Sequence, residues 1–224
     1  EQEALDAEAC CKIDPSLRDI RERIAGGIFT ASEETADCYR FCLELKRVLL
    51  ASSKFTPLAE TAVKRVRSLG NRVIGLETAN GVMDGDAYVL AAGVDSRALA
   101  LPIGIDLPIY PLRGYSVTIP LASPDDGPRL SITDYSNKIV YAPLDGALRA
   151  AGFVEIGGDG REIAEDRIET LLEAVRKTFP RITDLSRVQP WCGLRPATPL
   201  GTPIVGPTRY ANFFLNVGHG ALGF

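Results

Sequence analysis

The chain has 224 residues, of which 46% are hydrophobic and 24% charged, and this composition excludes disordered and fibrous classes. Its net charge of -4 and the absence of any run of five like charges argue against a nucleic-acid groove or a polybasic membrane patch. No apolar run approaches the roughly 18 residues of a membrane helix, and the first residues do not resemble a secretion signal. We therefore expect a cytoplasmic protein without a transmembrane segment, whose partners are small molecules or proteins.

The five cysteines predict reduced thiols rather than a disulfide framework. Their number is odd, Cys10 and Cys11 are adjacent, and Cys38 and Cys42 are four residues apart in a predicted helix. A zinc site would need four ligands. Since the only histidine is the distant His219, we predict no metal site.

In chain order, the first half of the sequence predicts short elements of mixed type. "KIDPSLRDI" indicates a capped helical turn, "AGGIFT" a short strand, and the 3–4 spacing of apolar residues over 32–53 an amphipathic helix. "AVKRVRS" and "RVIGLETAN" predict strands, and the turn Asn80-Gly81 leads into a hairpin region that ends in an apolar strand. "DSRALALPIG" predicts one or two helical turns that begin at Asp95 or Ser96.

From residue 107 onward, long strands separated by Pro and Asp-Gly turns predict a mostly antiparallel sheet. One helix interrupts them over residues 164–180, with its apolar side chains on one stripe and Pro180 at its end. We read 190–207 as a passage rich in Pro and Gly, followed by the closing strand "NFFLNV". The predicted fold class is α+β, or mixed α/β.

A glycine motif and one arginine are the candidates for chemistry. Gly218, Gly220 and Gly223 have the G-x-G-x-x-G spacing of a dinucleotide fingerprint after a predicted strand, but no helix or acidic residue follows. Arg195 stands between apolar residues and prolines, and its planar fork suits either a substrate carboxylate or an internal salt bridge. The hydroxyl of Tyr115 either contacts a ligand or belongs to a packed sheet residue.

Read together and in order, several motifs resemble the second half of FAD-dependent D-amino acid dehydrogenases, which are members of the D-amino acid oxidase superfamily. The five motifs are "DPSL", "GGIFTASEETADCYRF", "DAYVLAAG", "LPIGIDLPIYPLRGYSVTIP" and "WCGLRPATPLGTPIVGPTRYANFFLNVGHGALGF". The resemblance covers nearly the whole chain. It implies an antiparallel substrate domain of residues 1–30 and 99–205, and a partial FAD-binding domain of residues 31–98 and 206–224.

The resemblance also implies roles for single residues. Arg195, in the "GLRP" motif, would bind the substrate carboxylate, and Tyr115 would lie where the substrate sheet turns toward the active site. The remaining residues would contact FAD: Val63, Ala92, Gly93, Gly218, His219 and Gly220. Arg113 replaces a lysine that is more usual before "GYS", and Phe224 replaces a common tryptophan.

The activity implied is oxidation of a D-amino acid by hydride transfer to flavin, which gives a keto acid and ammonia, with a quinone or the respiratory chain as electron acceptor. The family's first glycine motif is not found in this sequence, so we expect a fragment that does not hold FAD by itself and whose parent works at the inner face of the membrane. The alternatives are an amine oxidase of the glycine or sarcosine type, and a folded module without a cofactor.

Overall fold

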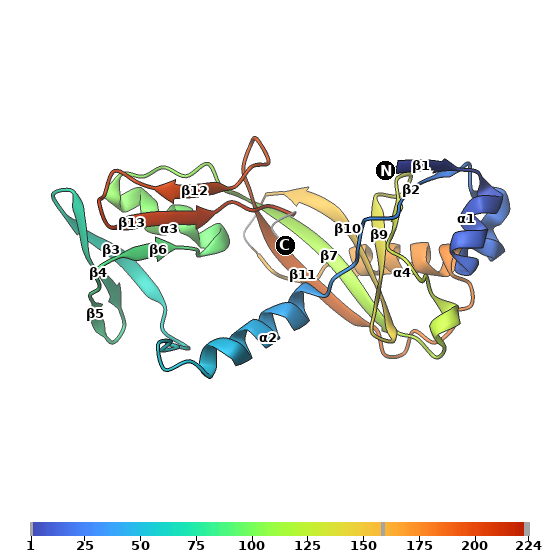
Figure 1. Cartoon of the computed structure of the whole chain (residues 1–224), viewed down its shortest axis with the longest axis horizontal. Helices are drawn as coiled ribbons and strands as arrows, with labels where there is room; N and C mark the ends of the chain where they lie inside the picture. The colour runs from blue at the N-terminus through green and yellow to red at the C-terminus, as the bar shows by residue number, and fades with distance from the viewer. Residues whose placement is uncertain (1, 158–159, 222–224) are drawn as a thin grey trace. The chain divides into compact units, whose positions relative to one another are not determined.

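The computed structural model describes residues 2–157 and 160–221, and these form two compact units (Figure 1). The first unit comprises Glu1–Phe41, Arg113–Glu155 and Gly160–Gly193. The second comprises Cys42–Leu112, Ile156–Asp159 and Leu194–Phe224. Which unit binds substrate and which binds flavin stays a prediction.

The first unit begins with a small antiparallel ladder and two short helices. Strand β1 (Gln2–Leu5) pairs with β2 (Gly27–Thr30), and α1 (Ala7–Ile13) and the 3-10 helix η1 (Pro15–Arg23) lie between them in the chain. Each helix has an aspartate cap, because Asp6 accepts from Ala9 N at 2.7 Å and Asp14 from Ser16 N at 3.1 Å. The predicted capped turn is therefore confirmed.

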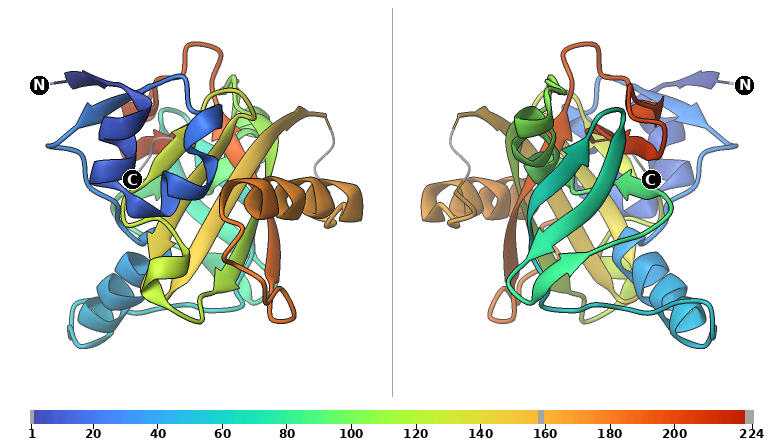
Figure 2. Two further views of the ribbon diagram at one scale, coloured as in Figure 1. Left: turned by 90° about the vertical axis from the view of Figure 1, so that its right-hand side faces the viewer. Right: turned by 90° about the vertical axis from the view of Figure 1, so that its left-hand side faces the viewer.

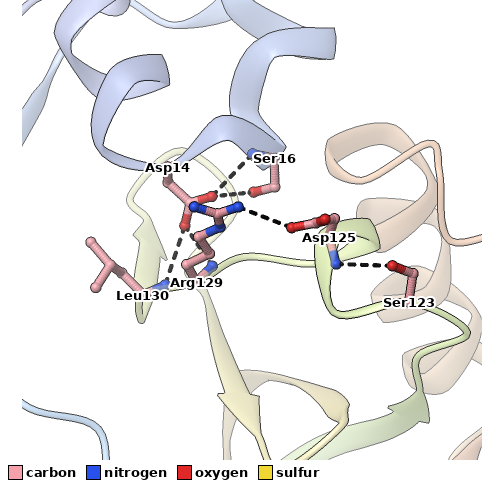
Figure 3. Close-up of polar contacts among 6 residues, drawn as sticks. All are labelled: Asp14, Ser16, Ser123, Asp125, Arg129 and Leu130. Carbon is pink, nitrogen blue, oxygen red and sulfur yellow. Dashed lines mark hydrogen bonds and ion pairs between the residues drawn. The ribbon is translucent and has the colours of Figure 1, made fainter.

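Asp14 also fixes this helical segment to a distant loop (Figure 3). Its carboxylate is 2% exposed and accepts the main-chain N–H groups of Arg129 and Leu130 at 2.8 and 3.2 Å, besides the N–H and hydroxyl of Ser16. The arginine side chain donates to Asp125 at 3.0 Å. A buried carboxylate with four donors is satisfied, so Asp14 acts as a structural clamp.

The sheet predicted for the second half of the chain has five strands in the order β11-β7-β10-β9-β8. Its antiparallel pairs include β8 with β9 and β9 with β10. Helix α4 lies against one face of this sheet (Figure 2). Its Leu171 and Val175 are fully buried and belong to one core cluster with Tyr115 and Val117 of β7. The elements are β7 (Tyr110–Pro120), η4 (Pro124–Asp126), β8 (Ile132–Asp134), β9 (Ile139–Leu144), β10 (Ala147–Ile156), α4 (Glu165–Thr178) and β11 (Gln189–Ala197).

The second unit contains two three-stranded sheets, β3-β4-β5 and β12-β13-β6, which share a core with a short helical segment. Asn212 joins the two sheets, because its side chain accepts from Val73 N and donates to Val73 O, both at 2.9 Å. The elements are β3 (Val63–Leu69), β4 (Arg72–Thr78), β5 (Gly81–Met83), β6 (Tyr88–Leu90), η2 (Gly93–Asp95), α3 (Ser96–Ala100), η3 (Leu101–Ile103), β12 (Ile204–Pro207) and β13 (Phe213–Val217).

The predicted fold class is confirmed, and the passage rich in Pro and Gly contains two strands for which no prediction was made from the sequence. These strands are β11, which begins at Gln189, and β12, and both contain prolines. Both strands lie at the edges of their sheets, where a residue without an N–H is tolerated. The amphipathic helix is present as α2 (Cys38–Leu50), and none of its residues is buried. Among the described residues, no helix has the length and apolar character that crossing a membrane requires.

Candidate flavin and substrate site

Two predicted flavin-contact segments follow two neighbouring parallel strands of the second unit. Strands β6 and β13 pair in parallel, with Phe213 opposite Tyr88 and Leu215 opposite Leu90 (Figure 1). Ala92–Gly93 follows β6 after one intervening residue, and Gly218–Gly220 comes directly after β13. Parallel strands end on the same side of a sheet, so both segments lie together at the C-terminal ends of β6 and β13. Ligands of α/β folds bind at this end of the strands.

The backbone of these segments fits the close approach of a flat cofactor. Gly93 and Gly220 have φ angles of 58° and 63°, and a β-carbon at either position would meet no atom within 4 Å. Their conformation favours glycine and the space over them is open. Gly218 differs, since its φ is 75° and a β-carbon would lie 2.7 Å from Thr198 Cγ2. Gly218 therefore lets this loop pack against the segment that follows Arg195, while Gly223, the last glycine of the predicted motif, lies outside the described residues.

Arg195 lies in β11, beside the glycine loop. Gly220 N donates to the carbonyl oxygen of Pro196 at 2.9 Å, so the loop is bonded to the residue that follows the arginine. The arginine is half-buried, and this burial lowers the pKa of its guanidinium. A cation that has lost water gains free energy from a charged, two-pronged partner. The structure thus brings Arg195 and Gly218–Gly220 together, with half-buried His219 between the glycines.

Val63 does not lie at these strand ends. It begins β3, in the other three-stranded sheet, where it pairs with Thr78. Its assignment to the adenosine part of FAD stays a prediction.

Tyr115 belongs to the first unit and lies in its core, with 1% of its surface exposed. Its hydroxyl donates to Glu155 Oε2 at 3.0 Å, and Arg167 Nε donates to the other oxygen of Glu155 at 2.7 Å. Both hydrogen bonds lower the pKa of the Glu155 carboxyl, and the bond from Arg167 has the larger effect. A hydrogen bond to Tyr115 raises the pKa of Arg113. The hydroxyl is thus engaged within its own unit, and its predicted contact with substrate remains untested.

Sequence reasoning missed Glu155 and Arg167. Both stand at positions that the strand and helix patterns assign to solvent, and their side chains are 29% and 40% exposed. No local pattern marks them, because strand and helix meet only in the folded unit. Arg167 also lies over the ring of Phe153, 5.3 Å from its centroid, and that ring meets Tyr115 edge to face.

The described residues do not offer a metal centre, since no three His, Cys, Asp or Glu side chains among them come together. Cys10, Cys11 and Cys192 are buried, whereas Cys38 and Cys42 are exposed on α2. Burial is the main cause that raises the pKa of each of the three buried thiols. Protonated, buried thiols are unreactive, so these three cysteines have a packing role.

The family model of FAD dependent oxidoreductases matches residues 1–224, so the chain belongs to that family. It is 40% identical over 223 residues to a D-amino acid dehydrogenase of Bradyrhizobium diazoefficiens, covering 99% of this chain and 52% of that protein. It is 42% identical to D-amino acid dehydrogenase 2 of Pseudomonas aeruginosa over 223 residues, covering 100% of this chain and 53% of that protein. The chain thus spans about half the length of the curated relatives it matches.

Solved structures show the same fold. Glycine oxidase from Geobacillus kaustophilus matches with a TM-score of 0.88 at 22% identity, covering 100% of this chain and 59% of that one. L-proline dehydrogenase from P. horikoshii matches with a TM-score of 0.80 at 16% identity, covering 99% of this chain and 60% of that one. At these identities the likeness concerns the fold alone.

Proposed function

We propose that the chain is the part of an FAD-dependent D-amino acid dehydrogenase that binds the substrate carboxylate and approaches the flavin ring. The observation that carries this proposal is the bond between Gly220 and Pro196, which holds half-buried Arg195 beside a loop with open glycine backbone. The names of the relatives support an amino acid as substrate. FAD, when bound, supplies the acceptor for a hydride from the substrate Cα.

The chain's own residues orient the substrate. Arg195 would hold the carboxylate in a planar, two-pronged pair, and the prolines near it restrict the backbone that carries this side chain. The backbone of Ala92–Gly93 and Gly218–Gly220 would approach the cofactor, because both segments follow the ends of parallel strands. The Gly220 N–H is bonded to the Pro196 carbonyl, so this residue would contribute its open face rather than a donor. No side chain of the chain need act as a strong base, since the amine can bind in its neutral form.

Cofactor retention is a separate proposal. The loops described above would contact one part of a dinucleotide, and a few peripheral contacts hold such a ligand weakly. We therefore expect the 224-residue chain, purified alone and dialysed, to be colourless, without flavin absorbance near 370 and 450 nm, approximate values for any flavin. A yellow protein with about one FAD per chain would contradict this proposal.

Arg195→Leu in the full-length enzyme tests the carboxylate role. We expect it to cost roughly 2–5 kcal/mol of transition-state binding, because the substrate carboxylate loses its charged partner. Arg195→Lys should recover part of the loss, since a lysine lacks the fork. Arg97→Leu is the matched control, because Arg97 is in the same unit and forms an exposed ion pair with Asp106 at 3.0 Å.

The measurement is kcat/KM for D-alanine. A change of less than about threefold for Arg195→Leu, which is under 1 kcal/mol, would show that the arginine serves an internal salt bridge instead. An equal loss for Arg97→Leu would show that the effect is not specific to Arg195.

The electron acceptor and the cellular location complete the proposal. We propose a quinone or another component of the respiratory chain as acceptor, and work at the cytoplasmic face of the membrane. "PLRGYSVTIP" and "NVGHGALGF" resemble the dehydrogenases more than the oxidases. The assay supplies D-alanine with either oxygen or a quinone analogue. Hydrogen peroxide formed as fast as the quinone is reduced would favour an oxidase, and activity on glycine or sarcosine alone would favour that alternative.

A further inference from the structure

Helices α1 and η1 line a pocket with polar side chains from both of them. Glu8, Cys11 and Lys12 are three and four residues apart on α1, so they share one face of that helix. Arg18 and Arg21 are three residues apart on η1, and side chains at this spacing are aligned in a 3-10 helix. These five side chains line one pocket of about 300 Å³ within the first unit.

Asp14 brings the two helices together, because it ends α1 and begins η1 without an intervening loop. Its N–H donates to the carbonyl oxygen of Cys10 at 2.9 Å, and its carboxylate accepts from the N–H and hydroxyl of Ser16 (Figure 3). The same carboxylate accepts from the N–H groups of Arg129 and Leu130. The walls of the pocket therefore belong to a segment whose turn is fixed by buried hydrogen bonds.

The pocket carries more positive than negative charge. Arg21 Nε lies 3.1 Å from Glu8 Oε2, and this ion pair joins the two helices. In the part of the chain that the structure describes, Lys12 and Arg18 form no ion pair. Three cations and one carboxylate thus leave an excess of two positive charges among the side chains that line the pocket.

The thiol of Cys11 lies close to these charges. Burial and then the charge of Glu8 raise its pKa, whereas the charges of Arg21 and Arg18 oppose this rise. Both guanidinium groups therefore lie near the wall that Cys11 forms, and the thiol itself stays protonated. Like charges gathered in one pocket repel each other unless an anion lies between them.

We propose that this pocket binds the phosphate group of a small soluble molecule. A phosphate dianion accepts from guanidinium and ammonium groups and offsets both excess charges, whereas a single carboxylate offsets one. Lys12, Arg18 and Arg21 are exposed, so a ligand reaches them without opening the core. The chain's net charge of -4 opposes binding to an anionic membrane, which favours a soluble ligand over a lipid headgroup. The site goes beyond the proposed oxidation of D-amino acids and is independent of it.

Calorimetric titration of the 224-residue chain with methyl phosphate tests the proposal. This monoester is a dianion at about pH 8, and sodium chloride holds the ionic strength constant so that general screening does not change. We expect saturable binding of about one phosphate per chain. Acetate, which has the same kind of acceptor oxygens and one charge, should bind at least about tenfold more weakly.

Variants of the pocket residues should change the affinity in opposite directions. Arg18→Gln and Lys12→Gln should each weaken the binding of methyl phosphate about tenfold, the effect of one lost charge-assisted hydrogen bond. Glu8→Gln should strengthen it about threefold, because the competing carboxylate is removed and Arg21 is released. A gain in affinity does not result from a damaged fold. Arg176→Gln is the matched control, since it removes the same charge from an exposed ion pair on α4 in the same unit.

Each outcome decides the inference. Saturable binding that weakens in Arg18→Gln and Lys12→Gln, strengthens in Glu8→Gln and is unchanged in Arg176→Gln supports the site. The absence of saturable binding, both by heat and by the NMR signals of the arginine Nε–H groups, overturns it. Equal weakening in Arg176→Gln also overturns it, because the binding would then follow the net charge of the chain. Binding to vesicles that contain phosphatidic acid, without binding of methyl phosphate, overturns it in favour of a lipid headgroup. None of these assays uses flavin or a D-amino acid, so each result leaves the proposed function as it stands.

Discussion

Replacing Asp14 tests whether its buried carboxylate clamps the first unit. Asp14→Ala removes four hydrogen bonds and leaves the main-chain N–H groups of Ser16, Arg129 and Leu130 without their acceptor. At about 1 kcal/mol for each unsatisfied N–H, the loss of unfolding free energy should be about 3 kcal/mol. Asp14→Asn keeps one acceptor oxygen and should cost roughly half of this.

The chain provides a matched control in Asp184. Its carboxylate accepts from Ser186 N at 2.9 Å and from Ser186 Oγ at 2.6 Å, the same local pattern that Asp14 makes with Ser16. Asp184 is exposed, however, and its described bonds are local. We expect Asp184→Ala to cost less than about 1 kcal/mol, because water replaces the lost partner.

The assay is urea unfolding followed by tryptophan fluorescence, because the only tryptophan, Trp191, lies in the same unit as Asp14. With an unchanged slope, a lower midpoint gives the loss in free energy directly. Equal midpoints for Asp14→Ala and Asp184→Ala would refute the argument, since burial and the distant N–H groups would then contribute nothing.

Three further predictions concern stability. The pKa of Glu155 is lowered in the folded chain, so its stabilising effect is present above the ordinary carboxyl pKa and is lost as pH falls. Between pH 7 and 3, the unfolding midpoint of Glu155→Gln should therefore fall less steeply than that of the unchanged protein. Asn212→Ala should cost about 2 kcal/mol, because both bonds to Val73 are lost, and calorimetry would show no shift if the amide is dispensable. Gly218→Ala should destabilise the second unit by more than Gly220→Ala, because only the former β-carbon meets Thr198; equal thermal midpoints would contradict this.

The sequence by itself determined most of the elements and the chemical candidates. The apolar stripe of residues 164–180 became α4, and its period alone specified which face packs on the sheet. The turn expected at Asn80-Gly81 lies one residue earlier, at Ala79-Asn80, and Gly81, with a φ of 113°, is the first residue of β5 and pairs with Thr78. Arg195 was singled out as a charge in an uncharged segment, and it is half-buried in the structure.

Only the tertiary structure decided which of these elements meet. The parallel pairing of β6 with β13 brings Ala92–Gly93 and Gly218–Gly220 to one sheet edge, and nothing local in either segment specifies that partner. The bonds of Glu155 with Tyr115 and Arg167 likewise join two strands and a helix. The edge position of β11, which makes its prolines tolerable, is also set by the sheet and not by its own sequence. Local patterns encode backbone conformation and the buried face, whereas pairing between distant segments depends on the packing of the whole unit, which no short window of sequence contains.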